Sequence, residues 1–228
     1  QRLIKKLDLN KFSITFVSLN NSYLKKNLIK KINFITLRAS RVILAIPQLR
    51  KIILSSNNNS FKKIIIISNQ NFANIIAYFS SIYINKVKRI FIDRNHIDEL
   101  NFTKNFKEKF KKIIIKFLMK ITYPKANQVI GVSNKLSNDL SIFVKTNVKT
   151  IYSPSFDTDI IKKSRETINL NKKFKYIINV SRFSKRKDHQ TTLNAFKIVS
   201  KKYDKIKLIL IGYGEERKNI IKLAKHLN

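Results

Sequence analysis

The chain has 228 residues and carries 48 Lys and Arg against 13 Asp and Glu, which gives a formal net charge of +35. Apolar residues make up 43% of the sequence, which is enough for a hydrophobic core and excludes wholesale disorder. The lack of cysteine excludes disulfides, thiolate zinc sites and cysteine nucleophiles, and the three histidines lie too far apart in the sequence to suggest a histidine-rich metal site. The positive charge favours phosphate groups and anionic membrane surfaces as partners.

Short apolar runs rich in β-branched residues alternate with longer segments of helical period, which predicts an α/β fold with a parallel sheet. The predicted strands cover residues 14–19, 32–37, 63–68, 89–93, 128–132, 149–153, 176–181 and 207–211. Helices are predicted at residues 40–55, 71–84, 103–121 and 189–202, and Ser133 is predicted to be a helix N-cap. The strand at 63–68 contains four consecutive isoleucines, so we expect helices to cover both of its faces.

The alternation of strands and helices is interrupted once, by the segment SPSFDTDIIKKSRETINLNKK. It contains a proline, clustered polar residues and no predicted strand, so we interpret residues 154–173 as a linker between a domain at 1–153 and a second domain at 174–228. The second domain has room for two strands and two helices, and we expect the chain to be a fragment in which this domain is truncated. The apolar runs are too short to cross a bilayer, and charged residues interrupt any signal-like start.

The segment that carries recognisable chemistry lies near the C-terminus and reads YIINVSRFSKRKDHQTTLNAF, followed by a strand that ends in IGYGEER. Arg182 and Lys187 stand on either side of a turn after a predicted strand, and the helix that follows begins at a predicted cap, Asp188. The two cations could converge on one anion at that helix N-terminus. Gly212 and Gly214 permit a tight turn and a close approach of backbone to ligand. The plainer alternatives are solvated cations in a lysine-rich chain and glycines that only shape a turn.

Taken together, these motifs resemble the second domain of family 4 (group 1) glycosyltransferases of the GT-B fold. The resemblance rests on VSRFSKRKDH, on NAF in the following helix and on IGYGEER, and it continues upstream through KANQVIGVSNKLSNDL and VKTIYSPSFD. It is specific over residues 125–228 and loose before them. It implies two Rossmann-like, doubly wound parallel-sheet domains, of which the first lacks its first strand and serves the acceptor, and the second binds a nucleotide sugar.

The resemblance also implies a reaction, namely transfer of a sugar (of hexosyltransferase type) from a nucleotide-diphosphate sugar to a polysaccharide, lipopolysaccharide or glycolipid, with retention of anomeric configuration. Arg182 and Lys187 fall on the family positions that bind the donor diphosphate, and Gly212 and Gly214 fall on the glycine turn that lines the donor cleft. Two fixed cations would stabilise the negative charge that builds on the leaving diphosphate, so we expect no metal and no further cofactor. We expect this 228-residue piece to be inactive by itself, because the family's pair of glutamates would lie beyond Asn228.

In the first domain, the segment RIFIDRNH places Asn95 and His96 just after a predicted strand. Relatives often carry a histidine or an ERN-like tripeptide in this loop near the reacting sugar, so the resemblance implies catalytic roles for Asn95 and His96. A polar loop without a catalytic role is the alternative.

The expected partners are the nucleotide-sugar donor, a glycan or lipid-linked acceptor, and an anionic membrane surface. Lysines of the acceptor-side domain would suit the last of these, which places the protein in the cytoplasm or peripherally on the inner face of the cytoplasmic membrane; they are Lys104, Lys107, Lys109, Lys111 and Lys112. A solvated helix face is the alternative reading of these lysines. The rival functions are a non-catalytic GT-B-like module that binds an anionic glycan or lipid, another GT-B enzyme such as a nucleotide-sugar epimerase, and a nucleic-acid binder. We expect no nucleic-acid partner, because no recognised motif for one is present.

Overall fold

The computed structural model describes residues 4, 6–19, 32–37, 39, 42–58, 63–101, 105–154 and 158–227, and Lys104 therefore lies outside the described residues. The chain divides into two compact units, Gln1–Asp157 and Thr158–Asn228. All eight predicted strands are present, with ends within three residues of those predicted. The predicted linker at 154–173 contains a short helix, α6 (Thr158–Ser164).

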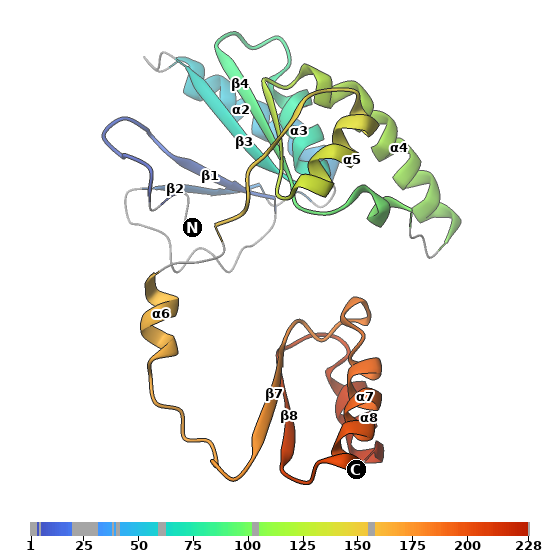
Figure 1. The fold of residues 1–228 in the computed structure, drawn as a ribbon. Helices are drawn as coiled ribbons and strands as arrows, with labels where there is room; N and C mark the ends of the chain where they lie inside the picture. The colour runs from blue at the N-terminus through green and yellow to red at the C-terminus, as the bar shows by residue number, and fades with distance from the viewer. Residues whose placement is uncertain are drawn as a thin grey trace. The chain divides into compact units, whose positions relative to one another are not determined.

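Unit 1 is built on a four-stranded parallel sheet whose strands are adjacent in chain order (Figure 1). The strands are β3 (Ile64–Asn69), β4 (Val87–Asp93), β5 (Gln128–Gly131) and β6 (Val148–Thr150). A separate parallel pair is formed by β1 (Thr15–Ser18) and β2 (Asn33–Thr36). The helices are α2 (Ala45–Asn58), α3 (Asn71–Ser81), α4 (Phe106–Thr122) and α5 (Asn134–Val144), with short 3-10 helices η2 (Val42–Leu44), η3 (Ile97–Leu100) and η4 (Tyr123–Lys125). Neighbouring strands of the four-stranded sheet are all parallel, so the chain crosses over between each pair, as expected for an α/β fold.

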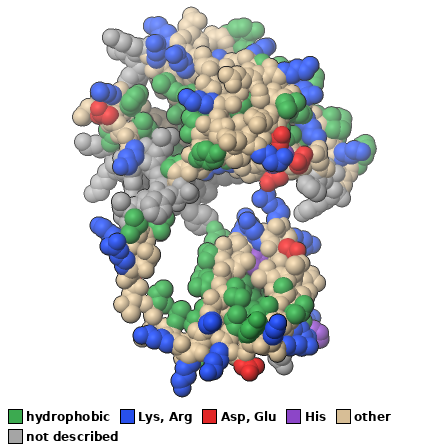
Figure 2. Space-filling model, in the orientation of Figure 1, with side chains coloured by type: hydrophobic (Ala, Val, Ile, Leu, Met, Phe, Trp, Pro, Cys, Tyr) green, Lys and Arg blue, Asp and Glu red, His purple; other side chains and the backbone are tan. Residues whose placement is uncertain are grey.

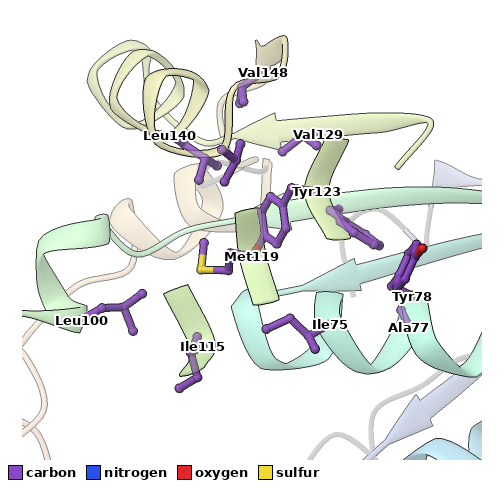
Figure 3. Close-up of a cluster of buried hydrophobic side chains, with 12 residues drawn as sticks. Ile75, Ala77, Tyr78, Leu100, Ile115, Met119, Tyr123, Val129, Leu140 and Val148 are labelled. Carbon is purple, nitrogen blue, oxygen red and sulfur yellow. The ribbon is translucent and has the colours of Figure 1, made fainter. Parts of the chain in front are cut away.

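The main core of unit 1 lies between one face of the four-stranded sheet and the helices α3, α4 and α5 (Figure 3). Phe91 and Val129 are cross-strand partners on β4 and β5, and both are almost fully buried. The Tyr123 ring meets Phe91 edge to face, with ring centroids 5.4 Å apart. Ser133 caps α5, since its Oγ accepts a hydrogen bond from the Leu136 N–H at 3.3 Å, which confirms the predicted cap.

The prediction that helices cover both faces of β3 is wrong for the described residues. Ile66 packs into the core, whereas Ile65 and Ile67 point to the other face and are 47% and 48% exposed. The reason is that α3, α4 and α5 all pack on the side of the sheet to which Ile66 points. A run of isoleucines is apolar on both faces, and the sequence alone does not state which face the helices cover.

Unit 2 has two parallel strands, β7 (Lys175–Val180) and β8 (Ile206–Ile211), and two long helices, α7 (His189–Lys202) and α8 (Arg217–Leu227). Its small core is formed by Phe183, Leu193 and Ile220, which come from the loop after β7 and from the two helices. In neither unit does a described helix have the length and apolar composition needed to span a bilayer. Lys and Arg side chains are distributed over the visible faces of both units (Figure 2).

Candidate functional site

The candidate site in unit 2 lies where β7 and β8 end and two loops continue side by side. The Ser181 N–H donates to the Ile211 carbonyl at 3.0 Å, and the Phe183 N–H donates to the Tyr213 carbonyl at 2.8 Å. The ladder between the strands therefore extends into the loops and fixes them against each other. This is the carboxyl edge of the parallel pair, the edge at which ligands bind in open α/β sheets.

Gly212 and Gly214 are required by the closeness of these loops. A Cβ added to Gly212 would collide with the Ser181 carbonyl oxygen, and one added to Gly214 would collide with that of Phe183. Gly214 also has a φ of 153°, a backbone angle that L-residues with a side chain rarely adopt. The close packing of the two loops thus explains the presence of both glycines without any ligand.

Arg182 lies two residues after the end of β7, and its side chain is exposed. Its Nη2 donates to Oε2 of Glu215 at 3.1 Å, and both side chains are more than half exposed. Because a guanidinium has five N–H donors, this bond leaves others that can reach an anion. Glu215 was not among the predicted site residues, although its position directly after the GYG turn was a usable signal. A hollow of about 320 Å³ adjoins Arg182 and is lined by Val180, Ser181, Arg182, Ile211, Gly212 and Tyr213.

Lys187 lies on the same loop as Arg182, at the end of the 3-10 turn η5 (Lys185–Lys187), and its side chain is exposed. The next residue, Asp188, is the N-cap of α7 in a left-handed conformation (φ 46°). The Thr191 N–H and Oγ1 donate to the two Asp188 carboxylate oxygens at 3.2 and 2.7 Å, which confirms the predicted cap. These hydrogen bonds from Thr191, side chain first, hold the pKa of Asp188 below its ordinary value. Lys187 therefore stands beside the positive end of α7.

His189 is the first residue of α7 and is buried, with 3% of its surface exposed. The Ser181 hydroxyl donates to Oδ1 of Asn179 at 2.9 Å, so the Nε2 N–H of His189, 3.0 Å away, donates to that hydroxyl. The Phe183 ring meets the imidazole edge to face at 5.0 Å. Nδ1 of His189 has no hydrogen-bond partner among the described residues. The histidine thus fixes the loop that begins at Ser181 and carries Arg182.

In unit 1, the residues predicted to be catalytic lie on the loop between β4 and η3. Asn95 is exposed, whereas His96 is half-buried and caps η3. The His96 Nε2 lies 2.6 Å from Oδ2 of Asp139, to which it donates, and Nδ1 lies 2.9 Å from Oδ2 of Asp98. This hydrogen bond from His96 is the largest of the causes that lower the pKa of Asp139. Asp139 belongs to α5 and comes from a distant part of the sequence, so the sequence analysis did not find it.

A buried polar network lies beneath this loop, at the end of β4. The Tyr123 hydroxyl donates to Oδ2 of Asp93 at 2.6 Å, and Nδ2 of Asn74 donates to the Tyr123 hydroxyl at 2.9 Å. The Ser68 hydroxyl donates in turn to Oδ1 of Asn74 at 2.7 Å. Burial raises the pKa of Asp93 from 3.8 to about 6, against the hydrogen bond from Tyr123, which lowers it. Burial also raises the pKa of Tyr123 well above 10, so the phenol keeps the proton that it donates.

The structure thus places the predicted site residues in two groups. Arg182 and Gly212 line one hollow, and Lys187 follows on the same loop. Asn95 and His96 lie together in the other unit. Among the described parts of the chain, no three His, Asp or Glu side chains gather so that they could hold a metal ion.

Comparison with known proteins gives these groups a family context. Residues 160–228, which contain the whole loop site of unit 2, match the family described as Glycosyl transferases group 1. A curated protein of Campylobacter jejuni is 28% identical over 162 residues, which cover 69% of this chain and 42% of that protein. It is named N-acetylgalactosamine-N,N'-diacetylbacillosaminyl-diphospho-undecaprenol 4-alpha-N-acetylgalactosaminyltransferase. The segment at residues 160–228 is thus similar to group 1 glycosyltransferases.

Solved structures support the predicted α/β fold of GT-B type. TarM of S. aureus, solved as a mutant in complex with fondaparinux, alpha-GlcNAc-glycerol and UDP, is similar with a TM-score of 0.52 and 17% identity over 82% of this chain and 34% of TarM. The N-terminal domain of Candida albicans trehalose-6-phosphate phosphatase is similar with a TM-score of 0.52 and 11% identity over 80% of this chain and 45% of that domain. At these identities the likeness concerns the fold. The chain spans less than half the length of each of these three proteins.

Proposed function

We propose that the protein is a glycosyltransferase that moves a sugar from a nucleotide-diphosphate donor to a glycan or lipid-linked acceptor. The observation that carries this proposal is the loop of unit 2, in which Arg182 and Lys187 follow a parallel strand within the segment matched by the group 1 family. Such an arrangement offers charge and hydrogen-bond donors to a diphosphate.

The chemistry follows from where charge develops. As the bond between the sugar and the diphosphate breaks, negative charge grows on the leaving phosphate. Arg182, Lys187 and the N-terminus of α7 present positive charge at one edge of the sheet, and fixed charges of this kind stabilise the transition state more than the ground state. The Glu215 carboxylate holds the Arg182 side chain in place, and the free guanidinium N–H groups would receive the phosphate. In this account no metal and no further cofactor takes part, and the anomeric configuration is retained.

On the acceptor side, we assign the reacting hydroxyl to the neighbourhood of Asn95 and His96. Asn95 is exposed and can hydrogen-bond a sugar. His96 is held at both ring nitrogens, because Nε2 donates to Asp139 and Nδ1 accepts from the Asp98 backbone N–H, so its orientation is fixed before substrate arrives. Asp139 is a positioning residue in this account.

The acceptor that we favour is a lipid-linked glycan. The support is the name of the Campylobacter relative, which describes a transferase acting on a sugar attached to diphospho-undecaprenol. An acceptor of that kind would bring the protein to the inner face of the cytoplasmic membrane. A nucleic acid has no part in this function.

The test is a transfer assay on the full-length protein, with UDP- and GDP-linked hexoses and N-acetylhexosamines as donors and a bacterial lipid extract as acceptor. The expected result is nucleotide release that depends on both donor and acceptor and falls at least a hundredfold in Arg182→Ala/Lys187→Ala. The matched control, Arg165→Ala/Lys172→Ala, removes the same charges from exposed positions elsewhere in unit 2 and should transfer at the wild-type rate. Tight nucleotide binding without sugar transfer from any of these donors would contradict the proposed glycosyltransferase activity. It would support the alternative of a non-catalytic binding module.

A further inference from the structure

Helix α4 has two apolar faces, and its partners in unit 1 cover one of them. The inner face carries Ile115 and Met119, which are 4% and 2% exposed and belong to the main core. The outer face carries large apolar side chains that are between 37% and 81% exposed. They are Phe106, Phe110, Ile113, Ile114, Phe117 and Ile121.

These six residues, here called the outer stripe, lie on one side of the helix. They follow one another at intervals of three or four residues, apart from the adjacent Ile113 and Ile114, and so occupy an arc of about 100°. The helix lies at one side of unit 1, where it is seen along its length (Figure 1). Three phenylalanines and three isoleucines in one continuous exposed row are unusual for a water-facing helix, and such surfaces mark interaction sites.

Lysines border the outer stripe on both sides. Counted at 100° per residue, Lys107 and Lys111 lie along one border, and Lys109, Lys116 and Lys120 lie along the other. Three of these lysines contact neighbouring side chains. Lys111 and Lys120 lie over the rings of Phe72 and Phe143, and Lys116 donates to the Asn101 side chain at 2.6 Å.

The acidic residue of α4 does not interrupt this pattern. Glu108 lies toward the inner face, where Lys112 is 3.3 Å from its carboxylate. The outer face of α4 is therefore apolar in the middle and basic at both edges, without a carboxylate in it.

We propose that the outer stripe of α4 docks on an anionic lipid surface. Helices that lie in a membrane interface have this composition, with large apolar residues facing the acyl chains and Lys at the level of the headgroups. Charge complementarity selects lipid over a second copy of the chain. Two copies meeting at this face would bring their lysine borders together on molecules that each carry a net charge of +35.

This docking surface goes beyond the proposed transfer reaction, because it concerns a helix that bears none of the proposed site residues. Its test uses neither donor nor acceptor. The docking proposal can therefore fail while the glycosyltransferase assignment stands, and the glycosyltransferase assignment can fail while the docking proposal stands.

The experiment is vesicle flotation of the purified protein, with phosphatidylcholine vesicles and with vesicles that also contain phosphatidylglycerol. We expect binding to the anionic vesicles that weakens at least tenfold in Phe110→Ser/Phe117→Ser. The control variant Ile168→Ser/Ile198→Ser removes two isoleucines of unit 2 that are each 73% exposed, and it should bind like the wild type. Both variants change exposed side chains, and circular dichroism should confirm that each is folded.

A second arm tests the lysine borders with Lys107→Gln/Lys109→Gln. This variant should lose affinity for anionic vesicles, and added salt should weaken the wild type in the same way. The proposal is overturned if the phenylalanine variant binds anionic vesicles as the wild type does. It is also overturned if sedimentation without lipid shows a wild-type dimer that the phenylalanine variant dissociates, because the stripe would then be a contact between two copies of the chain.

Discussion

Replacing Asp93 by asparagine tests the buried network under the His96 loop. Asp93 is 5% exposed, and its one side-chain hydrogen bond described above comes from Tyr123. Burial raises its pKa from 3.8 to about 6, so the folded protein binds a proton at this carboxyl more tightly than the unfolded chain does. The stability that Asp93 contributes is thus fully present below pH 3.8 and is lost as the pH rises through 6.

The size of the effect follows from the difference between the two pKa values. A rise of about two units, at roughly 1.4 kcal/mol each, gives a cost on the order of 3 kcal/mol for ionised Asp93 above pH 7. An asparagine keeps an acceptor for the Tyr123 hydroxyl and carries no charge. We therefore expect Asp93→Asn to raise the stability of unit 1 at pH 8, by at most about 3 kcal/mol, and to leave it nearly unchanged at pH 3.5.

The assay is urea unfolding in which hydrogen–deuterium exchange of peptides from β3, β4 and β5 is the measured signal. These peptides report on unit 1 alone. The control is Asp204→Asn, which changes an exposed carboxylate in unit 2. A difference in unfolding free energy between Asp93→Asn and wild type that is the same at pH 3.5 and pH 8 would refute the reasoning. So would a variant that is less stable than wild type at pH 8.

Further changes test the local geometry of both units. Gly212→Ala should destabilise unit 2 by about 1–3 kcal/mol, because the added Cβ meets the Ser181 carbonyl, and an unchanged melting temperature would contradict this. Asp188→Ala should destabilise unit 2 through the lost cap of α7, and an unchanged urea unfolding midpoint would show that the cap is dispensable. His96→Ala should raise the pKa of Asp139 toward 3.8, as measured by carboxyl NMR, and should remove stability that the pair contributes above pH 4 and loses on acidification. An Asp139 pKa that stays depressed in this variant would show that His96 is not its cause.

The sequence predicted the strands and the caps well, because both are local. Each strand is a short β-rich run between polar segments, and the caps at Ser133 and Asp188 depend on residues within the next turn. The placement of Arg182 and Lys187 on one loop also followed from local order.

Contacts between distant parts of the chain could not be predicted in this way. The bond between His96 and Asp139 joins a loop to a helix that lies far along the chain, and no pattern in either segment indicates it. The pair formed by Arg182 and Glu215 also depends on two loops lying side by side, although the position of Glu215 after the GYG turn was a usable signal.

The sequence likewise did not determine which apolar face of a strand or helix is buried. In β3, periodicity gives two apolar faces, and the structure buries the one that carries Ile66 while Ile65 and Ile67 stay exposed. In α4, apolar residues occur on opposite sides of the helix, and the packing of Ile115 and Met119 is what identifies the exposed stripe.

The most direct test of the central claim is calorimetric titration of UDP and GDP into the full-length protein, without added metal, for wild type and for Arg182→Ala/Lys187→Ala. We predict micromolar binding of one nucleotide that the double substitution weakens by tenfold or more, about 1.4 kcal/mol. Equal binding by both proteins, or binding by neither, would contradict the assignment of Arg182 and Lys187 to the donor diphosphate.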